Sequence, residues 1–388
     1  MRARPTPIRR TLFVMLTGIG SVLLCAVLLE SALWVGGTRL PVNLANYVVT
    51  KYNEWPRGIY VVDGKTGMNF MRPNHHTQNW FNGYSFEHRT DEWGFRNAPG
   101  IRDKEVLLVG DSMVFGHGLD VEQTAAHLLR AEYGHPVYNM ARQADCLYQE
   151  YLLLRLFLPR FRPKKVLLFP FINDLYEIVA RRPFQYLTWR PELTHYDYGL
   201  LWNDMHALWR GTPTNLRSFL MNFRAMRLYH ALEVEALAPP VALWPKDEQT
   251  GRPEMPHFLV PLMNLAWFRP AAQYFGAVMA DLSQRARQQG VELQLVDLDT
   301  RGALPRYAEA FDRMAGLVAN TCRHNRLACT STRAIFEDCD HCYLPYDGHF
   351  SVEGNRRLAK FLHKWLQRPN QERQAESAGS NHAGSRTP

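Results

Sequence analysis

The sequence has neither a lysine-rich tail nor a tight basic helix, although its 388 residues carry a formal net charge of +8. The positive residues are mostly arginines scattered along the chain, whereas proteins that track phosphates concentrate them, so we expect no nucleic-acid partner. The chain also has no internal repeat. Its composition, 46% hydrophobic and 21% charged, excludes a disordered or collagen-like protein. We therefore expect a folded body of one large or two modest domains.

Charge is absent altogether from residues 12–29, which follow a stretch, residues 1–10, with four arginines. An apolar run of this length is enough to cross a bilayer, and the basic start favours a cytoplasmic N-terminus. A cleaved signal peptide and a buried core helix are the alternatives, but the run exceeds a usual signal sequence and no small-x-small cleavage site follows. Leu24 before Cys25 argues against a lipid-modified cysteine. We therefore expect a retained transmembrane anchor over residues 11–35.

Metal-binding patterns are weak in this sequence. Five cysteines lie outside the anchor, at positions 146, 322, 329, 339 and 342. In an oxidising compartment the last four are expected to form two local bridges and to leave Cys146 free, although the sequence does not fix which cysteines pair. Zinc is the less favoured alternative, because the spacings C-x6-C and C-x2-C resemble a zinc site only loosely. His75, His76 and His341 lack acidic ligands at metal spacing and are expected at the surface, so no metal and no cofactor is predicted.

Short apolar runs alternate with helical patterns over the C-terminal two thirds of the chain. The expected strands cover residues 105–110, 137–139, 165–169, 291–296 and 327–331, and the expected helices cover residues 121–133, 146–158, 271–289, 307–324 and 352–367. This alternation is typical of α/β proteins. It predicts a three-layer sandwich with a mostly parallel sheet, of flavodoxin-like type, with right-handed crossovers.

The change of pattern along the chain predicts its organisation. We expect a basic N-terminus (1–10), the anchor (11–35), an N-terminal extension (36–103), the α/β domain (104–368) and a polar, disordered tail (369–388). Residues 175–265 interrupt the α/β alternation and are rich in tryptophan, at positions such as 189, 202, 209 and 244, with Trp267 just beyond. Aromatic rings offer flat apolar faces to sugars or acyl chains, but they also pack small domains. We expect an inserted cap whose underside touches the substrate.

Polar side chains follow the expected strands at the points where those strands end. These segments are Gly110–Ser112, Asn139–Gln143 and Asn173–Asp174, with Asp347–His349 just before the last helix. Ligands of an open parallel sheet bind outside the carboxyl ends of its strands. A serine, a histidine and a carboxylate at this edge are the groups needed for acyl transfer by a nucleophilic hydroxyl.

In this order the four segments resemble the motifs of the SGNH, or GDSL, family of serine esterases and acyltransferases, over residues 105–367. Val109–Met113 matches the nucleophile block, and Asp347–His349, with Gly354 beyond it, matches the last block. Asp91–Asn97 also looks like the stretch before the first strand in membrane-associated members. Two departures stand out: Asp347 lies two residues before His349 where the family commonly has three, and Ala141 replaces a usual glycine.

The resemblance implies a role for each residue. Ser112 attacks an ester carbonyl, His349 takes its proton, and Asp347 orients His349. The oxyanion meets the N–H of Ser112, the N–H of Ala141 and the side-chain amide of Asn173. Asp111 is expected to be structural, bonded to nearby backbone. Asp338 and Asp340 are next in line if Asp347 is not the acid.

Each candidate also has an ordinary structural interpretation, with Ser112 as a helix cap, Asn173 and Asp174 as a turn, and His349 as a partly exposed residue at a helix entry. Their alignment at strand ends favours a site.

The sequence therefore predicts a serine esterase anchored in the inner membrane, with its catalytic domain in the periplasm. Its partners would be the membrane and O-acyl esters of envelope glycans or lipids. The alternatives are an O-acyltransferase acting on a polysaccharide and a catalytically silent glycan-binding or assembly domain.

Overall fold

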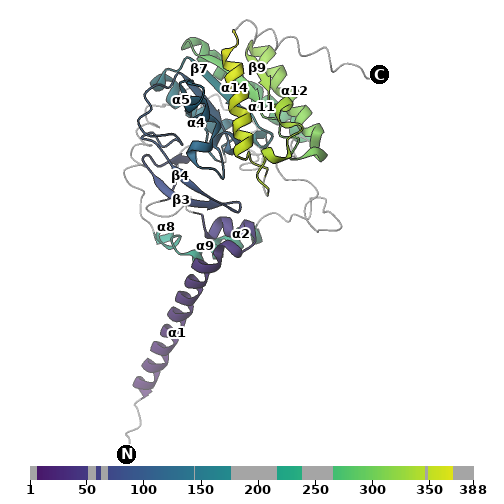
Figure 1. Cartoon of the computed structure of the whole chain (residues 1–388). Helices are drawn as coiled ribbons and strands as arrows, with labels where there is room; N and C mark the ends of the chain where they lie inside the picture. The colour runs from purple at the N-terminus through teal and green to yellow at the C-terminus, as the bar shows by residue number, and fades with distance from the viewer. Residues whose placement is uncertain are drawn as a thin grey trace, which may run out of the picture. The chain divides into compact units, whose positions relative to one another are not determined.

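The structure, a computed structural model, describes residues 7–50, 58–62, 69–143, 145–175, 216–237, 265–345 and 348–369 (Figure 1). The chain forms two compact units. Unit 1 comprises Met1–Ile59, Asn79–Ser85 and Thr212–Pro239. Unit 2 comprises Tyr60–Gln78, Phe86–Gly211 and Pro240–Pro388.

Unit 1 begins with a long apolar helix, α1 (Pro7–Gly36). It is long and apolar enough to cross a membrane, and its apolar stretch is not buried by the rest of the chain. A short 3-10 turn, η1 (Gly37–Arg39), leads into α2 (Val42–Val48). Two helices from the interrupted region, α8 (Leu216–Leu220) and α9 (Arg224–Leu237), complete the unit.

A small apolar cluster holds these helices together. Leu33 of α1 is buried with Val48 and Val49, and side chains from three further segments pack against them: Leu40, Trp80, Ala225 and Leu228. The cluster therefore joins the end of α1 to α2 and α9.

The N-terminal extension also contributes two small antiparallel sheets. One pairs β1 (Tyr60–Val62) with β2 (Asn69–Met71), and the other pairs β3 (His76–Phe81) with β4 (Tyr84–Arg89). The two residues between β3 and β4, Asn82 and Gly83, both have positive φ, at 53° and 89°. Asn-Gly is the preferred pair for such a hairpin turn, because both residues tolerate the left-handed conformation.

Unit 2 is built around a five-stranded sheet in which every pairing is parallel. Its strands, in spatial order, are β6 (Val137–Asn139), β5 (Val106–Gly110), β7 (Lys165–Phe169), β8 (Glu292–Asp297) and β9 (Ala328–Ser331). All five residues of β5 are buried, as expected for a strand covered on both faces.

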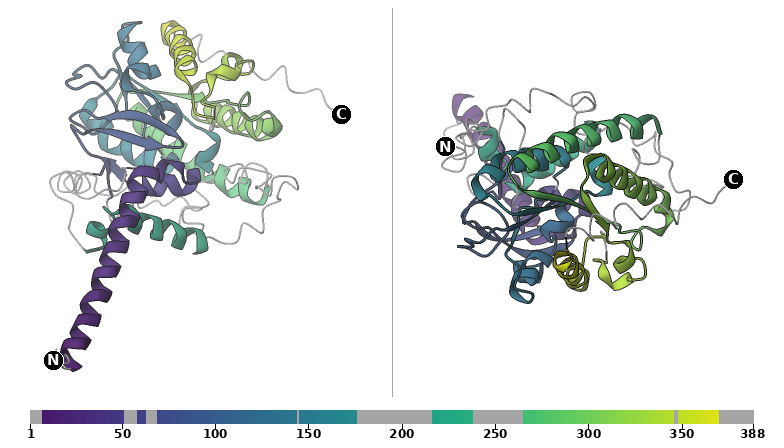
Figure 2. Two further views of the ribbon diagram at one scale, coloured as in Figure 1. Left: turned by 60° about the horizontal axis from the view of Figure 1, so that its bottom comes forward. Right: turned by 90° about the horizontal axis from the view of Figure 1, so that it is seen from above.

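Helices cover both faces of this sheet (Figures 1 and 2). The chain passes from β5 to β6 toward one edge of the sheet, and the later connections, from β6 to β7, β8 and β9, run toward the other edge. Because the crossovers are right-handed, the helix between β5 and β6 lies on the opposite face from the helices of the later connections. Helices α4 (Ala125–Ala131) and α14 (Val352–Gln367) contact each other on one face. On the other, α11 (Leu265–Gln288) contacts α5 (Leu147–Phe161) and α12 (Ala308–Asn325). The predicted three-layer α/β sandwich is confirmed.

Most predicted elements agree with the structure to within a few residues, and two differ more. The helix expected over residues 121–133 is divided into a 3-10 turn, η2 (Val121–Gln123), and α4. The division falls at Thr124, whose side chain caps α4 by accepting from His127 N. Helix α11 begins six residues before the predicted residue 271 and contains Pro270, a residue more typical of a helix's first turn.

The four C-terminal cysteines form two disulfides, Cys322–Cys329 and Cys339–Cys342, and Cys146 is buried and forms no disulfide. The prediction of two local bridges is confirmed, and the zinc alternative does not hold because these thiols are paired.

Some predictions fall outside the described residues. Of the predicted cap, the structure describes α8 and α9, which belong to unit 1. The tryptophans at positions 189, 202, 209 and 244 lie outside the described ranges, as do residues 370–388 of the predicted tail. The cap and the disordered tail therefore stay predictions.

Candidate active site

Ser112 lies directly beyond the end of the central strand β5, as the first residue of the short helix α3 (Ser112–Phe115). Strand β5 stands between β6 and β7, at the point where the crossovers reverse direction, and this is where ligands of open α/β sheets bind. The turn is tight at Gly110. A Cβ atom there would come within 2.9 Å of Val114 and 3.2 Å of Phe169, so only glycine fits without a shift.

His349 reaches the serine from the loop that precedes α14. Its Nε2 atom lies 2.8 Å from Ser112 Oγ, although the two residues are 237 positions apart in the sequence. Leu344 N donates to His349 O (2.6 Å), and Tyr343 and Phe350 form a β-bridge across the same loop. Gly348 has a φ of 74°, a left-handed conformation that glycine adopts without strain. These contacts hold the described backbone at His349 and Phe350 in place.

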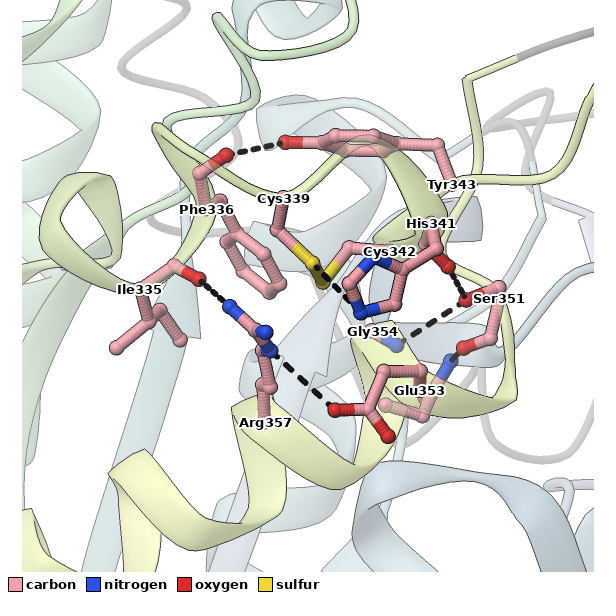
Figure 3. Close-up of a disulfide and its surroundings, with 11 residues drawn as sticks. Ile335, Phe336, Cys339, His341, Cys342, Tyr343, Ser351, Glu353, Gly354 and Arg357 are labelled. Atoms are coloured by element: carbon pink, nitrogen blue, oxygen red, sulfur yellow. Dashed lines mark hydrogen bonds and ion pairs between the residues drawn. A yellow bond between two sulfur atoms is a disulfide. The ribbon is translucent and has the colours of Figure 1, made fainter.

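The disulfide Cys339–Cys342 supports this loop from the side of α14 (Figure 3). Ser351 N donates to Cys342 O (2.8 Å), and Ser351 Oγ donates to His341 O (2.7 Å) while it accepts from Gly354 N (3.2 Å). A Cβ atom at position 354 would lie 2.2 Å from Cys342 O, so the disulfide turn packs directly on the first turn of α14. The bridge therefore lies in a turn that is fixed to the first turn of α14, the helix that follows His349.

Asp111 organises the turn that presents Ser112. Its Oδ1 accepts from Met113 N (2.9 Å), and its Oδ2 accepts from the Asn173 side-chain amide (2.8 Å). Burial raises the pKa of the Asp111 carboxyl above its ordinary value, and the bonds from Met113 and Asn173 oppose that rise. Asp111 bonds backbone as expected. It also fixes one hydrogen of the Asn173 amide, which has a second hydrogen to donate.

Ala141 is fully buried, and its N–H is engaged within the protein, donating to Asn139 Oδ1 (3.0 Å). The N–H groups of Met140 and Arg142 donate to carbonyls of β5 and its end, at Leu108 (2.8 Å) and Gly110 (3.1 Å). This segment therefore continues alongside β5, and the structure does not direct the Ala141 N–H at a ligand. The Ser112 N–H, by contrast, is at the start of α3, where helices leave their donors without intrahelical acceptors.

The remaining predicted residues lie elsewhere or outside the described ranges. Asp347 lies outside them, and Asp338 and Asp340 are exposed. Of the histidines expected at the surface, His76 and His341 are exposed and His75 is half-buried.

A second histidine, His117, belongs to the site and was not predicted. Its ring lies against the ring of His349 with centroids 4.4 Å apart, and Phe86 packs edge-on against it at 5.4 Å. Its Nδ1 lies 3.2 Å from the Gln143 amide nitrogen, and its backbone N–H donates to Ser112 O (3.2 Å). Glycines 116 and 118, both with positive φ, flank it, so the Gly-His-Gly sequence was the available signal.

The segment Asp91–Asn97 holds two backbone segments next to the site, the one after Ser112 and the end of β6. The buried guanidinium of Arg96 donates to the carbonyls of Phe115 (3.2 Å), Gly116 and Leu119, which belong to the loop after Ser112. Asn97 exchanges two 2.9 Å hydrogen bonds with the backbone of Asn139 at the end of β6. The resemblance had singled out this segment, and the contacts give its physical role.

Asp91 anchors the same segment. It accepts from the hydroxyl of Tyr138 (2.5 Å) and from the backbone N–H groups of Trp93 (2.9 Å) and Phe95 (3.0 Å). Burial nevertheless raises the pKa of Asp91 to about 6, because these bonds only partly offset the loss of solvation. The buried carboxyl of Asp91 therefore favours its protonated form more than a solvated carboxyl does.

No protein-family model and no curated protein matches the chain. Similar solved structures include TesA, with 16% identity over 68% of this chain and 97% of that one (TM-score 0.37). They also include the psychrotrophic esterase EstA from Pseudoalteromonas sp., with 13% identity over 68% of this chain and 100% of that one (TM-score 0.36).

A further similar structure is an acetylxylan esterase from Geobacillus stearothermophilus, with 13% identity over 69% of this chain and 95% of that one (TM-score 0.37). Others are described as a lipolytic protein of the G-D-S-L family, an SGNH hydrolase and a GDSL-like lipase.

Proposed function

We propose that the chain is a serine ester hydrolase of the SGNH type that acts through an acyl-enzyme. The observation that carries this proposal is the 2.8 Å contact between His349 Nε2 and Ser112 Oγ at the carboxyl edge of the sheet. A hydroxyl becomes a competent nucleophile when an imidazole within hydrogen-bond reach accepts its proton. The two residues come from opposite ends of unit 2, so the fold itself makes the pair.

In the first step, Ser112 Oγ forms a bond to the acyl carbon while its proton passes to His349 Nε2. The bond between the acyl carbon and the leaving alcohol then breaks, and the alcohol departs with the proton held by His349. A water molecule enters, gives a proton to His349 and attacks the acyl carbon. Ser112 recovers its proton as the carboxylic acid leaves. This sequence needs no cofactor.

The negative charge on the carbonyl oxygen is assigned to two donors, the Ser112 N–H and the second hydrogen of the Asn173 amide. Asp111 supports the second assignment, since its 2.8 Å bond with Asn173 restricts rotation of that amide. One such donor typically stabilises the transition state by about 3 kcal/mol. The third donor expected from the sequence is the Ala141 N–H. It donates to Asn139 Oδ1, and the proposed mechanism does not use it.

Asp347 remains the proposed acid. It lies two residues before His349, and the left-handed Gly348 between them permits a sharp change of chain direction. Its carboxylate would orient the imidazole and stabilise the imidazolium that forms during each transfer. Replacement of Asp347 by Asn, measured beside replacements of the exposed Asp338 and Asp340, identifies the acid as the position whose loss reduces turnover severely.

We further propose that α1 anchors the enzyme in the inner membrane with unit 2 in the periplasm. The two disulfides of unit 2 support an oxidising compartment, and the four arginines in residues 1–10 favour a cytoplasmic N-terminus. In that position the expected substrates are O-acyl esters of envelope glycans or lipids. A reporter fused after residue 388 tests the topology, since it should be active only outside the cytoplasm.

Turnover distinguishes the proposed hydrolase from its alternatives. The purified chain should release acid from acetyl and short-chain aryl esters in water, and Ser112→Ala should abolish this release. Transfer of the acyl group to an added glycan in preference to water would instead identify an O-acyltransferase. Absence of both reactions would favour a glycan-binding or assembly domain.

A further inference from the structure

We propose that α8 and the turn that joins it to α9 form an interfacial collar that lies among the lipid headgroups of the membrane that α1 spans. The collar is defined by three exposed apolar residues, Leu216, Phe219 and Phe223. The proposal rests on the proposed anchor and adds a second, separate contact between the protein and the bilayer. Its occupant is the lipid surface itself.

The first step concerns the level at which α1 leaves the membrane. Arg10 and Glu30 bracket the charge-free stretch of α1 and are 20 positions apart. At a rise of 1.5 Å per residue this stretch is about 30 Å long, which is also about the thickness of the hydrocarbon core. A charged side chain at a helix end lies at the polar boundary, since burial at the bilayer centre is costly. Glu30 therefore marks the boundary next to the folded units.

The second step ties α9 to that boundary. Glu30 accepts from the backbone N–H groups of Arg224 and Ala225, each at 2.9 Å. A carboxylate in this place caps the first turn of α9 and complements the positive end of its dipole. The Arg224 guanidinium donates to Leu33 O (2.9 Å) and lies 4.0 Å from the centre of the Trp34 ring. The start of α9 is thus fixed at the level of Glu30–Trp34.

The third step concerns what the chain exposes at that level. Leu216 is 73% exposed, Phe219 48% and Phe223 43%, and the rings of the two phenylalanines meet edge to face at 5.9 Å. Trp34, on α1 itself, is 59% exposed. Figures 1 and 2 show α8 and α9 beside the end of α1 that leads into α2. Exposed apolar clusters of this kind mark protein or membrane contacts.

Continuity with α1 decides in favour of lipid. The large apolar side chains of α1 are exposed from Leu12 to Leu29, and the collar residues come directly before the helix start that Glu30 caps. Aromatic residues concentrate at the boundary between water and lipid, where the ring meets apolar chains at headgroup depth. A collar at this depth would hold unit 1 against the membrane surface and restrict the tilt of α1.

The test uses the full chain in phosphatidylcholine and phosphatidylglycerol vesicles. In a background where Cys25 and Cys146 are replaced by serine, one new cysteine carries a polarity-sensitive nitrobenzoxadiazole label. Phe219→Cys reports on the collar and Ile19→Cys on the middle of α1. Ser85→Cys, an exposed polar position of unit 1, is the matched control. Each protein is measured with lipids that carry a quenching doxyl group at a shallow or a deep acyl carbon.

We expect the label at position 219 to be quenched several-fold more by the shallow doxyl lipid than by the deep one, with emission shifted to the blue. The label at position 19 should show the opposite order, and the label at position 85 should respond to neither lipid. If position 219 behaves like position 85 while position 19 is quenched, the anchor stands and the collar is wrong. If position 19 is also unquenched, the anchor fails and the collar fails with it.

Discussion

The imidazole ring of His117 lies against that of His349, with ring centroids 4.4 Å apart and a tilt of 49° between the planes. Phe86 and Gln143 hold His117 on its other sides. His349 is therefore packed against a fixed, buried aromatic ring while its Nε2 faces Ser112. On the proposed mechanism His117 is a positioning residue, since it restricts the rotation of the general base.

Replacement of His117 by alanine should lower kcat about tenfold or more, with KM little changed, because His349 would spend less time facing Ser112. A tenfold loss corresponds to about 1.4 kcal/mol in the barrier. His117→Phe keeps an aromatic ring in the same place and should recover most of the lost kcat. Steady-state kinetics on a short-chain ester separate the two variants. Equal losses in both would show that the ring contact does not matter for positioning.

Asn173→Ala should reduce kcat by about a hundredfold or more while KM stays nearly constant. The amide is assigned to charge that exists only in the transition state, and one such donor is worth about 3 kcal/mol. Asp111→Asn is the companion variant, because it retains an acceptor for Met113 N but removes the charge that fixes the amide. We expect an intermediate loss of kcat from it. A rise in KM at constant kcat in Asn173→Ala would instead assign that side chain to ground-state binding.

The two disulfides should differ in their effect on activity. Cys339 and Cys342 are three positions apart, and Cys322 and Cys329 seven, so both close short loops and contribute modestly to stability through chain entropy. Only Cys339–Cys342 supports the loop of His349, through Ser351 and the start of α14. Replacing this pair by serines should lower kcat several-fold beyond the effect of replacing the other pair. The comparison needs kcat and the urea midpoint for both double variants, and equal kcat values would contradict the assigned support.

Stability should depend on pH through Asp91. Burial raises its pKa to about 6, so the folded state favours the protonated form. Protonated Asp91 therefore adds about 3 kcal/mol to the free energy of unfolding, relative to high pH. This contribution is fully present below the pKa of the unfolded chain, near 4, and it is lost as the pH rises through 6. Asp91→Asn cannot titrate and should lack this component between about pH 4 and pH 7. Because burial also raises the pKa of Asp297, to about 7, the test is the difference between wild type and variant in urea unfolding. If the free energy of unfolding of the two proteins changed with pH in parallel, the role assigned to Asp91 would be wrong.

The sheet and the order of the site segments were predictable from the sequence because both depend on local pattern. The buried strands β5 and β7 read as continuous apolar runs, and Ser112 and Asn173 follow them closely. Carboxyl ends of parallel strands share one edge, which places Ser112 near Asn173. His349 lies 18 residues beyond the end of β9, and it was expected at this edge because of the motif that it resembles.

Other features depend on contacts between distant side chains and could not be read in this way. The ring of His117, which contacts His349, stands between Gly116 and Gly118, and both glycines adopt positive φ. The Ala141 N–H donates to the side chain of Asn139, two residues before it, and the motif does not predict this hydrogen bond. The bond between Glu30 and Arg224 joins residues 194 positions apart. In each case the partner is selected by the packed structure and not by a local pattern.

Covalent labelling of Ser112 by a fluorophosphonate tests the central claim most directly. The reagent reacts with a serine whose hydroxyl is activated by a general base, and mass spectrometry of the digested protein locates the modified residue. We predict one label, on Ser112 in the wild-type chain, and its loss in Ser112→Ala and in His349→Ala, with ester turnover lost in both variants. An unlabelled wild type, or a Ser112→Ala variant that still hydrolyses esters at the wild-type rate, would contradict the account.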